Sequence, residues 1–294
     1  MSLLQHPLPS VQAYVQAFSD APLPVLRHTV RAFASLRESG ENVGARHLSA
    51  VVIADPLMTM RLLTHLERHR RQSQNHDITT IERAVMMMGV EPFFTAFADL
   101  PTVEDALAAH PRALIGVLKV IARARRAADY ARDFAVVRRD IDPQEITVAT
   151  LLHEATEIVC WIMAPQLTLQ VFERQRDNPR LRSADAQRAV FSASAAELQL
   201  ALIRAWHLPE LLVTLLDDSQ QDNPRVRTIQ LAADFARHLA HGWEDPALPD
   251  DLTALEALLH LGREPLLHRL GVPEDVRARF LPPPAAEPPA SATA

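Results

Sequence analysis

The chain has 294 residues, a length that suits one large domain or two small ones. Its net charge of −6 provides no overall field that would favour a nucleic acid or an anionic membrane. The single cysteine, Cys160, excludes an internal disulfide and a zinc site built from cysteines. The seven glycines form no dinucleotide-binding or P-loop motif, and their scarcity disfavours a β-sandwich or barrel, whose hairpins need residues at positive φ.

Apolar residues three and four positions apart, often after a proline, predict helices along most of the chain. In chain order, the expected helices lie at residues 25–36, 56–66, 79–88, 111–135, 144–163, 183–206, 209–216 and 226–239. Asp55 is placed to cap the second of these, with Pro56 at its first position, and Gly89 is placed to end the third. In the fourth, Leu114, Leu118 and Ile121 are expected to lie on one face. Because no stretch of strand length alternates between polar and apolar residues, we expect an all-α fold, a compact multi-helix bundle.

Composition divides the chain into four expected parts. They are an N-terminal helical extension at 1–19, a main helical domain at 20–241, a C-terminal helical extension at 242–280 and a disordered tail at 281–294. The tail is rich in proline and alanine and cannot bury a core. Periodicity leaves open whether the main domain is one unit or two lobes, at 20–100 and 111–241.

The start of the chain lacks the charged and apolar regions of a secretory signal. No uninterrupted apolar run approaches the roughly 18 residues that span a bilayer. We therefore expect a cytoplasmic protein that makes no membrane contact.

Two pairs of histidines have helical spacing. His65 and His69 lie four residues apart, which suits a divalent metal, but the H-E-x-x-H motif is absent because Leu66 follows the first histidine. The polar residues after Leu66 favour a solvated helix face. His238 and His241 lie near the expected end of a helix, where imidazole interacts favourably with the helix dipole, and we expect them to be exposed.

A basic stretch runs from Arg123 to Arg139. Its arginines are at positions 123, 125, 126, 132, 138 and 139. A nucleic-acid binder would need such charge on one helix face, but these positions do not share one helical phase, and three aspartates partly neutralise them. We prefer a solvated helix face and do not expect a nucleic-acid partner.

The apolar segment at 147–163 is interrupted by His153 and Glu154, with Glu157 one turn later. Helical metal phosphohydrolases present an adjacent histidine and acid in this way. The same pattern suits a core helix whose polar face meets another helix. Cys160 lies in this apolar helix, where a thiol is usually buried and inert.

Six short elements follow one another along the chain. They are a Leu-Pro opening at 21–26, the junction at Asp55–Pro56, the helix pattern at 78–89 that closes on Gly89, L-L-H-E at 151–154, Glu197 followed by W-H-L-P-E at 206–210, and L-A-A-D ending at Asp234. In this order they resemble the HDOD family, the HD-related output domain of bacterial signalling proteins. The resemblance covers about residues 20–240 and implies an all-α bundle of HDOD or HD-like type and a role in signal transduction.

The chain departs from the metal-binding pattern of the related HD phosphohydrolases, which use a first histidine, a His-Asp pair and later ligands. No histidine lies between His110 and His153, and the acid of the pair is Glu154. The later histidine positions hold Ala195, Ser219 and Gln220. A hydrolytic site needs about three protein ligands to hold an ion and activate water. The resemblance with these departures implies no metal, no cofactor and no hydrolase activity.

The leading hypothesis is a non-catalytic signalling module that binds a protein partner or an unidentified small ligand. Its candidate interaction groove lies between the helix that begins at Leu151 and the corner after the 183–206 helix. The groove residues are Leu151, Glu157, Glu197, Trp206, Leu208 and Pro209. Trp206 suits either an interface anchor or a core position.

Two alternatives stay open at this stage. The first is a divergent metal-dependent nucleotide phosphodiesterase in which Asp217, Asp218 or Asp234 replaces the lost histidines. The second is a nucleotide or nucleic-acid binder that uses the arginines at 123–139.

Overall fold

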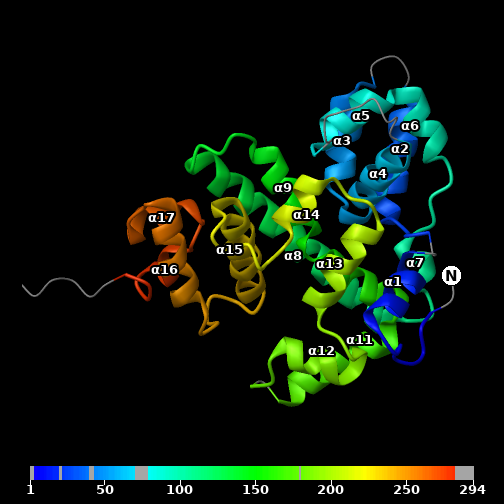
Figure 1. The fold of residues 1–294 in the computed structure, drawn as a ribbon. Helices are drawn as coiled ribbons and strands as arrows, with labels where there is room; N and C mark the ends of the chain where they lie inside the picture. The colour runs from blue at the N-terminus through cyan, green and yellow to red at the C-terminus, as the bar shows by residue number, and fades with distance from the viewer. Residues whose placement is uncertain (1–2, 20–21, 40–42, 70–78, 179, 282–294) are drawn as a thin grey trace, which may run out of the picture. The chain divides into compact units, whose positions relative to one another are not determined.

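The computed structural model describes residues 3–19, 22–39, 43–69, 79–178 and 180–281, and these residues contain helices and no strand (Figure 1). The expected all-α fold is therefore confirmed. The chain forms two compact units, Met1–Arg237 and His238–Ala294. The helices before residue 238 are α1 (Val11–Ser19), α2 (Arg27–Glu38), α3 (Ala45–Ile53), α4 (Pro56–His69), α5 (Ile81–Met88), α6 (Val90–Ala96), α7 (Val103–Ala106), α8 (Pro111–Val137), α9 (Pro143–His153), α10 (Ala155–Met163), α11 (Pro165–Asp177), α12 (Ser183–Phe191), α13 (Ala195–Ala205), α14 (Glu210–Leu215) and α15 (Pro224–Leu239), which ends two residues past the boundary.

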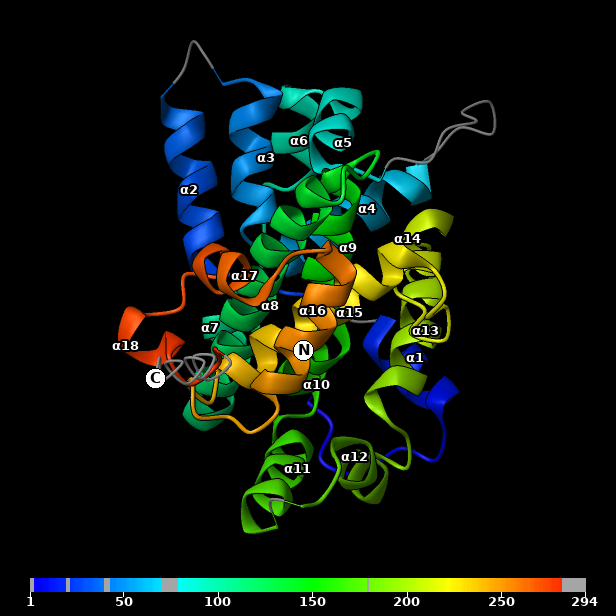
Figure 2. The same ribbon diagram turned by 90° about the vertical axis from the view of Figure 1, so that its left-hand side faces the viewer.

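The N-terminal helices enclose an aromatic core. Figure 2 shows α2, α3, α5 and α6 side by side at one end of the first unit. Phe93 of α6 lies between two other rings, with centroids 5.2 Å from Phe33 of α2 and 4.9 Å from Phe97. The Phe33–Phe93 pair is edge-to-face and the Phe93–Phe97 pair is tilted, and such ring pairs stabilise a core beyond their area burial. The expected helix end at Gly89 is present, with φ of +83° closing α5.

Asp55 joins the starts of two helices. Its Oδ1 accepts hydrogen bonds from the backbone N–H groups of Leu57 (2.9 Å) and Met58 (3.3 Å) in the first turn of α4. Its Oδ2 accepts from the N–H of Leu26 and the hydroxyl of Thr29 at the start of α2, both at 2.8 Å. The capping of α4 follows from the Asp-Pro pair, whereas the link to α2 has no local signal.

The long helix α8 packs through small residues. Its buried positions are Ala113, Val117, Val120, Ile121, Ala124, Ala127, Ala128, Ala131, Phe134 and Ala135. The face that holds Leu114, Leu118 and Ile121 is only partly buried, because Leu118 is 38% exposed. Alanines let neighbouring helices approach closely, and Leu151 of α9 packs against Ala124 and Ala128. The close-packed surface of α8 is therefore made largely of alanine.

Gly116 of α8 lies beneath the buried indole of Trp161. A Cβ at position 116 would lie 2.8 Å from two atoms of that ring, closer than real contacts allow. We expect Gly116→Ala to lower the free energy of unfolding by about 1–3 kcal/mol through overpacking. This is the reverse of the gain of about 1 kcal/mol that helix propensity alone would give. Urea denaturation measures the sign of the change in the free energy of unfolding. A stabilised variant would show that the Trp161 ring moves aside at little cost.

Two expected long helices are each broken in two. Residues 144–163 divide into α9 and α10, with Glu154 at φ −93° and ψ 8° between them. Residues 183–206 divide into α12 and α13 because Ser192 adopts a left-handed conformation, with φ of 59°. Ser194 then caps α13 in a capping box with Glu197. The prediction of a single helix was wrong at both places.

One helical stretch among the described residues, Pro143–Met163, is long and apolar enough to cross a membrane by length and composition. Its apolar window is 89% buried inside the protein. Burial in a helical core accounts for this apolar character.

The second unit contains α16 (Leu248–Leu259), α17 (Arg263–Arg269) and α18 (Glu274–Arg277). The side chain of His241 is 70% exposed, as expected. His238 is different, because its side chain is only 28% exposed and its Nδ1 lies 2.6 Å from Oδ2 of Asp251. Asp251 is buried on α16 and needs a polar partner. Apart from Leu281, the predicted tail lies outside the described residues.

Candidate functional site

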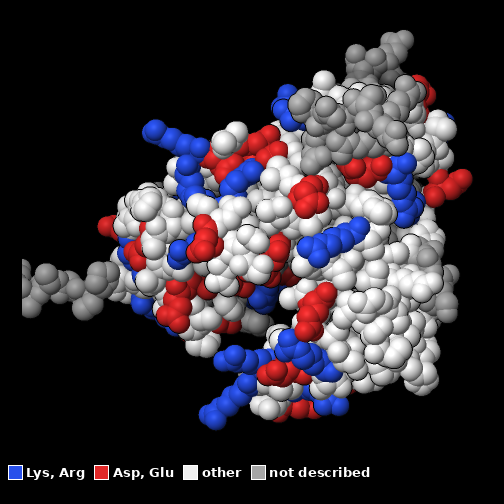
Figure 3. Space-filling view, viewed as in Figure 1, with Lys and Arg blue, Asp and Glu red and all other residues white. Residues whose placement is uncertain are grey.

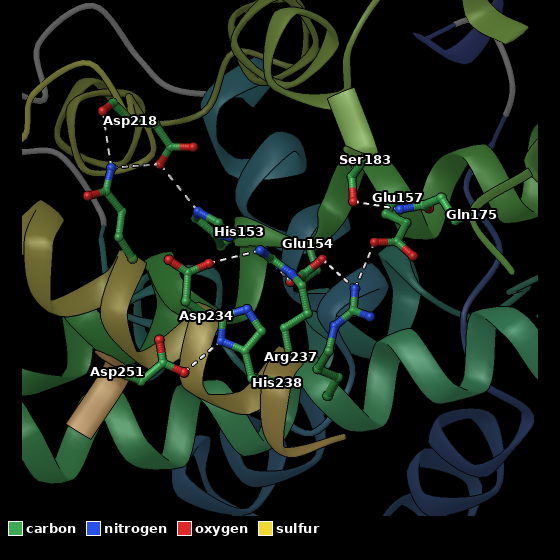
Figure 4. Close-up of polar contacts among 12 residues, drawn as sticks. His153, Glu154, Glu157, Gln175, Ser183, Asp218, Asp234, Arg237, His238 and Asp251 are labelled. Carbon is green, nitrogen blue, oxygen red and sulfur yellow. Dashed lines mark hydrogen bonds and ion pairs between the residues drawn. The ribbon is translucent and has the colours of Figure 1, made fainter. Parts of the chain in front are cut away.

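His153 and Glu154 lie at the junction of α9 and α10. Figure 4 shows their polar contacts. The Glu154 side chain is only 6% exposed, and a guanidinium group meets each of its oxygens. Oε2 accepts a hydrogen bond of 2.7 Å from Nη2 of Arg123 on α8. Oε1 accepts one of 3.5 Å from Nη2 of Arg237 on α15. A buried carboxylate is thus enclosed between two cations.

Arg123 joins two acids. Its Nη2 also donates to Oε2 of Glu157, at 2.7 Å. Burial would raise the pKa of Glu154, but the charges of Arg123 and Arg237 outweigh it and lower that pKa to about 2. Burial raises the pKa of Glu157, and the charge of Arg123 offsets only part of this rise. Glu154 is therefore the firmly ionised member of the pair.

His153 makes a separate ion pair. Its side chain is 11% exposed, and its Nε2 lies 3.3 Å from Oδ1 of Asp218. Burial lowers the pKa of His153, but the hydrogen bond to Asp218 and the charge of Glu154 outweigh it, so the net shift is upward. Gln230 also donates to Oδ1 of Asp218, at 3.2 Å. His153 at the end of α9 is thus linked to the loop between α14 and α15.

The remaining members of this group come from α15. Asp234 accepts a hydrogen bond of 2.8 Å from Nη1 of Arg237, one turn away on the same helix. We call the whole group the His153 cluster. Its members are Arg123, His153, Glu154, Glu157, Asp218, Asp234 and Arg237.

The donor set of the His153 cluster does not fit a metal ion. Among the described residues, no three histidine, cysteine, aspartate or glutamate side chains are placed to hold one. Both oxygens of Glu154 are engaged by arginines, and Asp234 is paired with Arg237. A divalent cation would meet two guanidinium groups at the position where the HD pattern needs carboxylate and imidazole ligands.

The candidate groove residues lie in several places. Leu151 is 1% exposed in the core, and Glu157 belongs to the His153 cluster. Glu197 is part of the capping box of α13. Leu208 and Pro209 line one small cavity with Arg204 and Glu210, whereas Trp206, 3% exposed, lines another beside α4.

The basic stretch at 123–139 is not one solvated face. Arg123 is bound to Glu154 and Glu157, and Arg138 donates to the carbonyl of Pro224 (2.8 Å) and to the hydroxyl of Thr228 (2.6 Å). The expectation of a fully solvated face is wrong at these two positions. On the face drawn in Figure 3, basic and acidic side chains are interspersed. A nucleic-acid surface would instead need basic charge gathered on one face.

Two further predictions concern His65, His69 and Cys160. The imidazole rings of His65 and His69 stack with centroids 4.1 Å apart, and His65 packs edge-on against Phe97. His65 is half-buried, so the expected solvated face is wrong there, while His69 is exposed. Cys160 is buried as expected, and burial raises the pKa of its thiol to about 12.

The fold is thus an all-α bundle with a histidine and an acid at a buried helix junction. The chain belongs to the HDOD domain family, which matches residues 23–222. The resemblance seen in the sequence is thereby confirmed.

Solved structures share this fold. A virulence factor from Campylobacter jejuni subsp. jejuni is 18% identical, with a TM-score of 0.65, over 92% of this chain and 97% of that chain. The MmoQ response regulator from Methylococcus capsulatus str. Bath is 18% identical, with a TM-score of 0.56, over 88% of this chain and 97% of that chain. The search of curated proteins gives no match. At these identities the likeness concerns the fold alone.

Proposed function

We propose that this chain is a cytoplasmic, non-catalytic module of bacterial signal transduction that acts by binding a protein partner or a small ligand. The observation that carries the proposal is the state of Glu154, whose two oxygens are held by Arg123 and Arg237. Membership of the HDOD family supports the signalling role. The response regulator MmoQ, which has the same fold, is compatible with it.

The charges of the His153 cluster support this proposal over catalysis. In metal hydrolases, an ion lowers the pKa of a bound water and stabilises developing negative charge. Here guanidinium groups already neutralise the buried acid, and a guanidinium cannot bind and deprotonate a water as a metal does. α8 contains no histidine and contributes Arg123 as one of these guanidinium groups. The cluster therefore fixes α8, α9, α10 and α15 to one another.

Metal content and turnover test the non-catalytic role. We expect the purified chain, incubated with Mn²⁺ or Fe²⁺ and then dialysed, to retain no stoichiometric metal by mass spectrometry. We also expect hydrolysis of cyclic and linear nucleotides to match that of His153→Ala. A stoichiometric ion that is lost in His153→Ala, together with turnover, would refute the proposal.

One observation favours a second candidate, the divergent phosphodiesterase. Asp218 and Asp234, two of the aspartates suggested as replacement ligands, do lie in the His153 cluster, whereas Asp217 bonds to Ser219 at 2.7 Å. Nδ1 of His153 is buried and has no hydrogen-bond partner in the described part of the chain. If this candidate holds, Asp218→Asn should abolish turnover, and the same assay decides between the two functions.

A further inference from the structure

One face of α4 lines a cavity of about 380 Å³ in the first unit. Arg61, His65, Arg68 and His69 all face it, at the i, i+4, i+7 and i+8 spacing of a single helix face. Pockets that hold small molecules begin at about this size. The cavity is distinct from the His153 cluster, because no member of that cluster lines it.

The charge of this cavity is unbalanced. Among the described residues, none of those that line it is acidic. Arg61 donates to the carbonyl oxygen of Leu23, which fixes one end of its guanidinium group. Arg68 is exposed at the rim and makes no ion pair within the described part of the chain. Burial, together with the charges of His69 and Arg61, lowers the pKa of His65, as expected in an environment that is already positive.

Neutral donors complete the polar lining. The hydroxyl group of Thr64 lies on the same face of α4. The hydroxyl oxygen of Ser19 is buried and, among the described residues, has no hydrogen-bond partner. Buried hydroxyls are normally paired, so an unpaired one in a cavity wall indicates a missing acceptor. Phe97 and Trp206 close the apolar side of the cavity.

These groups match one ligand chemistry. A phosphate group offers three strong acceptor oxygens and close to two negative charges, and arginine binds it with a planar fork of donors. A metal ion is disfavoured here, because His65 and His69 are stacked on each other beside Arg61, and Nδ1 of His69 contacts the carbonyl oxygen of His65 at 2.7 Å. A ring attached to the phosphate would lie against Phe97.

We propose that this cavity binds a small phosphate ester with an apolar ring, its phosphate held by Arg61 and Arg68 and its ring packed against Phe97. The assignment goes beyond the proposed function, because it holds whether or not the His153 cluster is catalytic. Its test is therefore a binding measurement and requires no turnover.

Isothermal titration calorimetry of the full chain with phenyl phosphate tests the proposal. We expect saturable one-to-one binding, weaker binding of inorganic phosphate, and no binding of phenol. Arg68→Gln should weaken the binding of phenyl phosphate roughly tenfold or more, because it removes charged hydrogen bonds to the phosphate. Arg68 is a surface residue, so we expect this variant to fold. Arg61→Gln should do the same if the variant folds.

The matched control is Arg125→Gln, which removes the same charge from an exposed position on α8. We expect it to bind phenyl phosphate like the wild-type chain. Absence of phenyl phosphate binding would overturn the proposal. It would also be overturned if Arg125→Gln weakened this binding as much as Arg68→Gln does, or if Arg68→Gln left the binding unchanged. Benzoate binding as tightly as phenyl phosphate would overturn the assignment to a phosphate, and phenol binding as tightly would overturn the role of the arginines.

Discussion

Replacing Arg123 with methionine is expected to lower the free energy of unfolding by about 3–5 kcal/mol at pH 7. The substitution leaves Glu154 buried with only the longer contact to Arg237, and it leaves Glu157 without its cation. Removing one partner of a buried ion pair costs more than the pair itself contributes, because the remaining charge stays out of water. Urea denaturation followed by circular dichroism measures the loss.

The control for this prediction is Arg125→Met, two positions along the same helix and exposed. Surface changes of this kind usually shift stability by less than about 0.5 kcal/mol. Adding Glu154→Gln to Arg123→Met should recover part of the loss, because it removes a buried charge that keeps only the longer contact to Arg237. A loss as small as that of the control would mean that Glu154 is not held by Arg123.

The same variant has a defined pH dependence. In the folded wild-type chain, the pKa of Glu154 is lowered to about 2 from an ordinary value of 4.5, so its ionisation contributes stability above pH 4.5. That contribution is lost as the pH falls toward 2. Because Arg123→Met removes the larger part of this effect, the difference between wild type and variant should be greatest near neutrality and shrink below pH 4.5. A difference that grows with acidity would contradict the assignment.

Replacing Asp55 with alanine is expected to cost about 3 kcal/mol or more. Asp55 is fully buried, and its loss removes the caps of α2 and α4 together. A lost cap costs about 1 kcal/mol, and each buried donor left unpaired adds roughly 1–3 kcal/mol. Thermal and urea denaturation should both report the loss.

Asp55→Asn and Asp99→Ala provide the comparison. Asparagine keeps one acceptor oxygen, so Asp55→Asn should be intermediate between wild type and Asp55→Ala. Asp99 is exposed, and its removal should change stability by less than about 0.5 kcal/mol. Equal effects of Asp55→Ala and Asp99→Ala would show that the link between α2 and α4 contributes nothing.

The sequence predicts helices best where their ends carry local chemistry. Asp55 before Pro56 and Gly89 after α5 mark real boundaries, because capping and positive φ depend on neighbouring residues alone. The break before α13 also had a signal, since Ser194 and Glu197 form a capping box. The break at Glu154 has neither glycine nor proline beside it. Tertiary contacts of its side chain, which are not local, accompany that break.

The candidate site was predictable only in part. His153 and Glu154 stand out as polar residues in an apolar segment, and their burial follows from that setting. Their partners Arg123 and Arg237 lie 31 and 83 positions from Glu154, and no spacing rule connects residues so far apart. The cavity beside α4 was missed for a similar reason. The helix face of His65 and His69 was visible, but Phe97 and Trp206, which close it, come from other elements.

The burial of Cys160 has a practical consequence for experiments on this protein. Its thiol is buried, and its pKa of about 12 leaves almost no thiolate at neutral pH. Alkylating reagents should therefore not modify Cys160 while the chain stays folded. A cysteine introduced on the surface would then be the sole reactive one, without any need to engineer the native residue away. Spin labels or fluorophores placed in this way can report helix movements directly. Delayed modification of Cys160 itself would time the opening of the core.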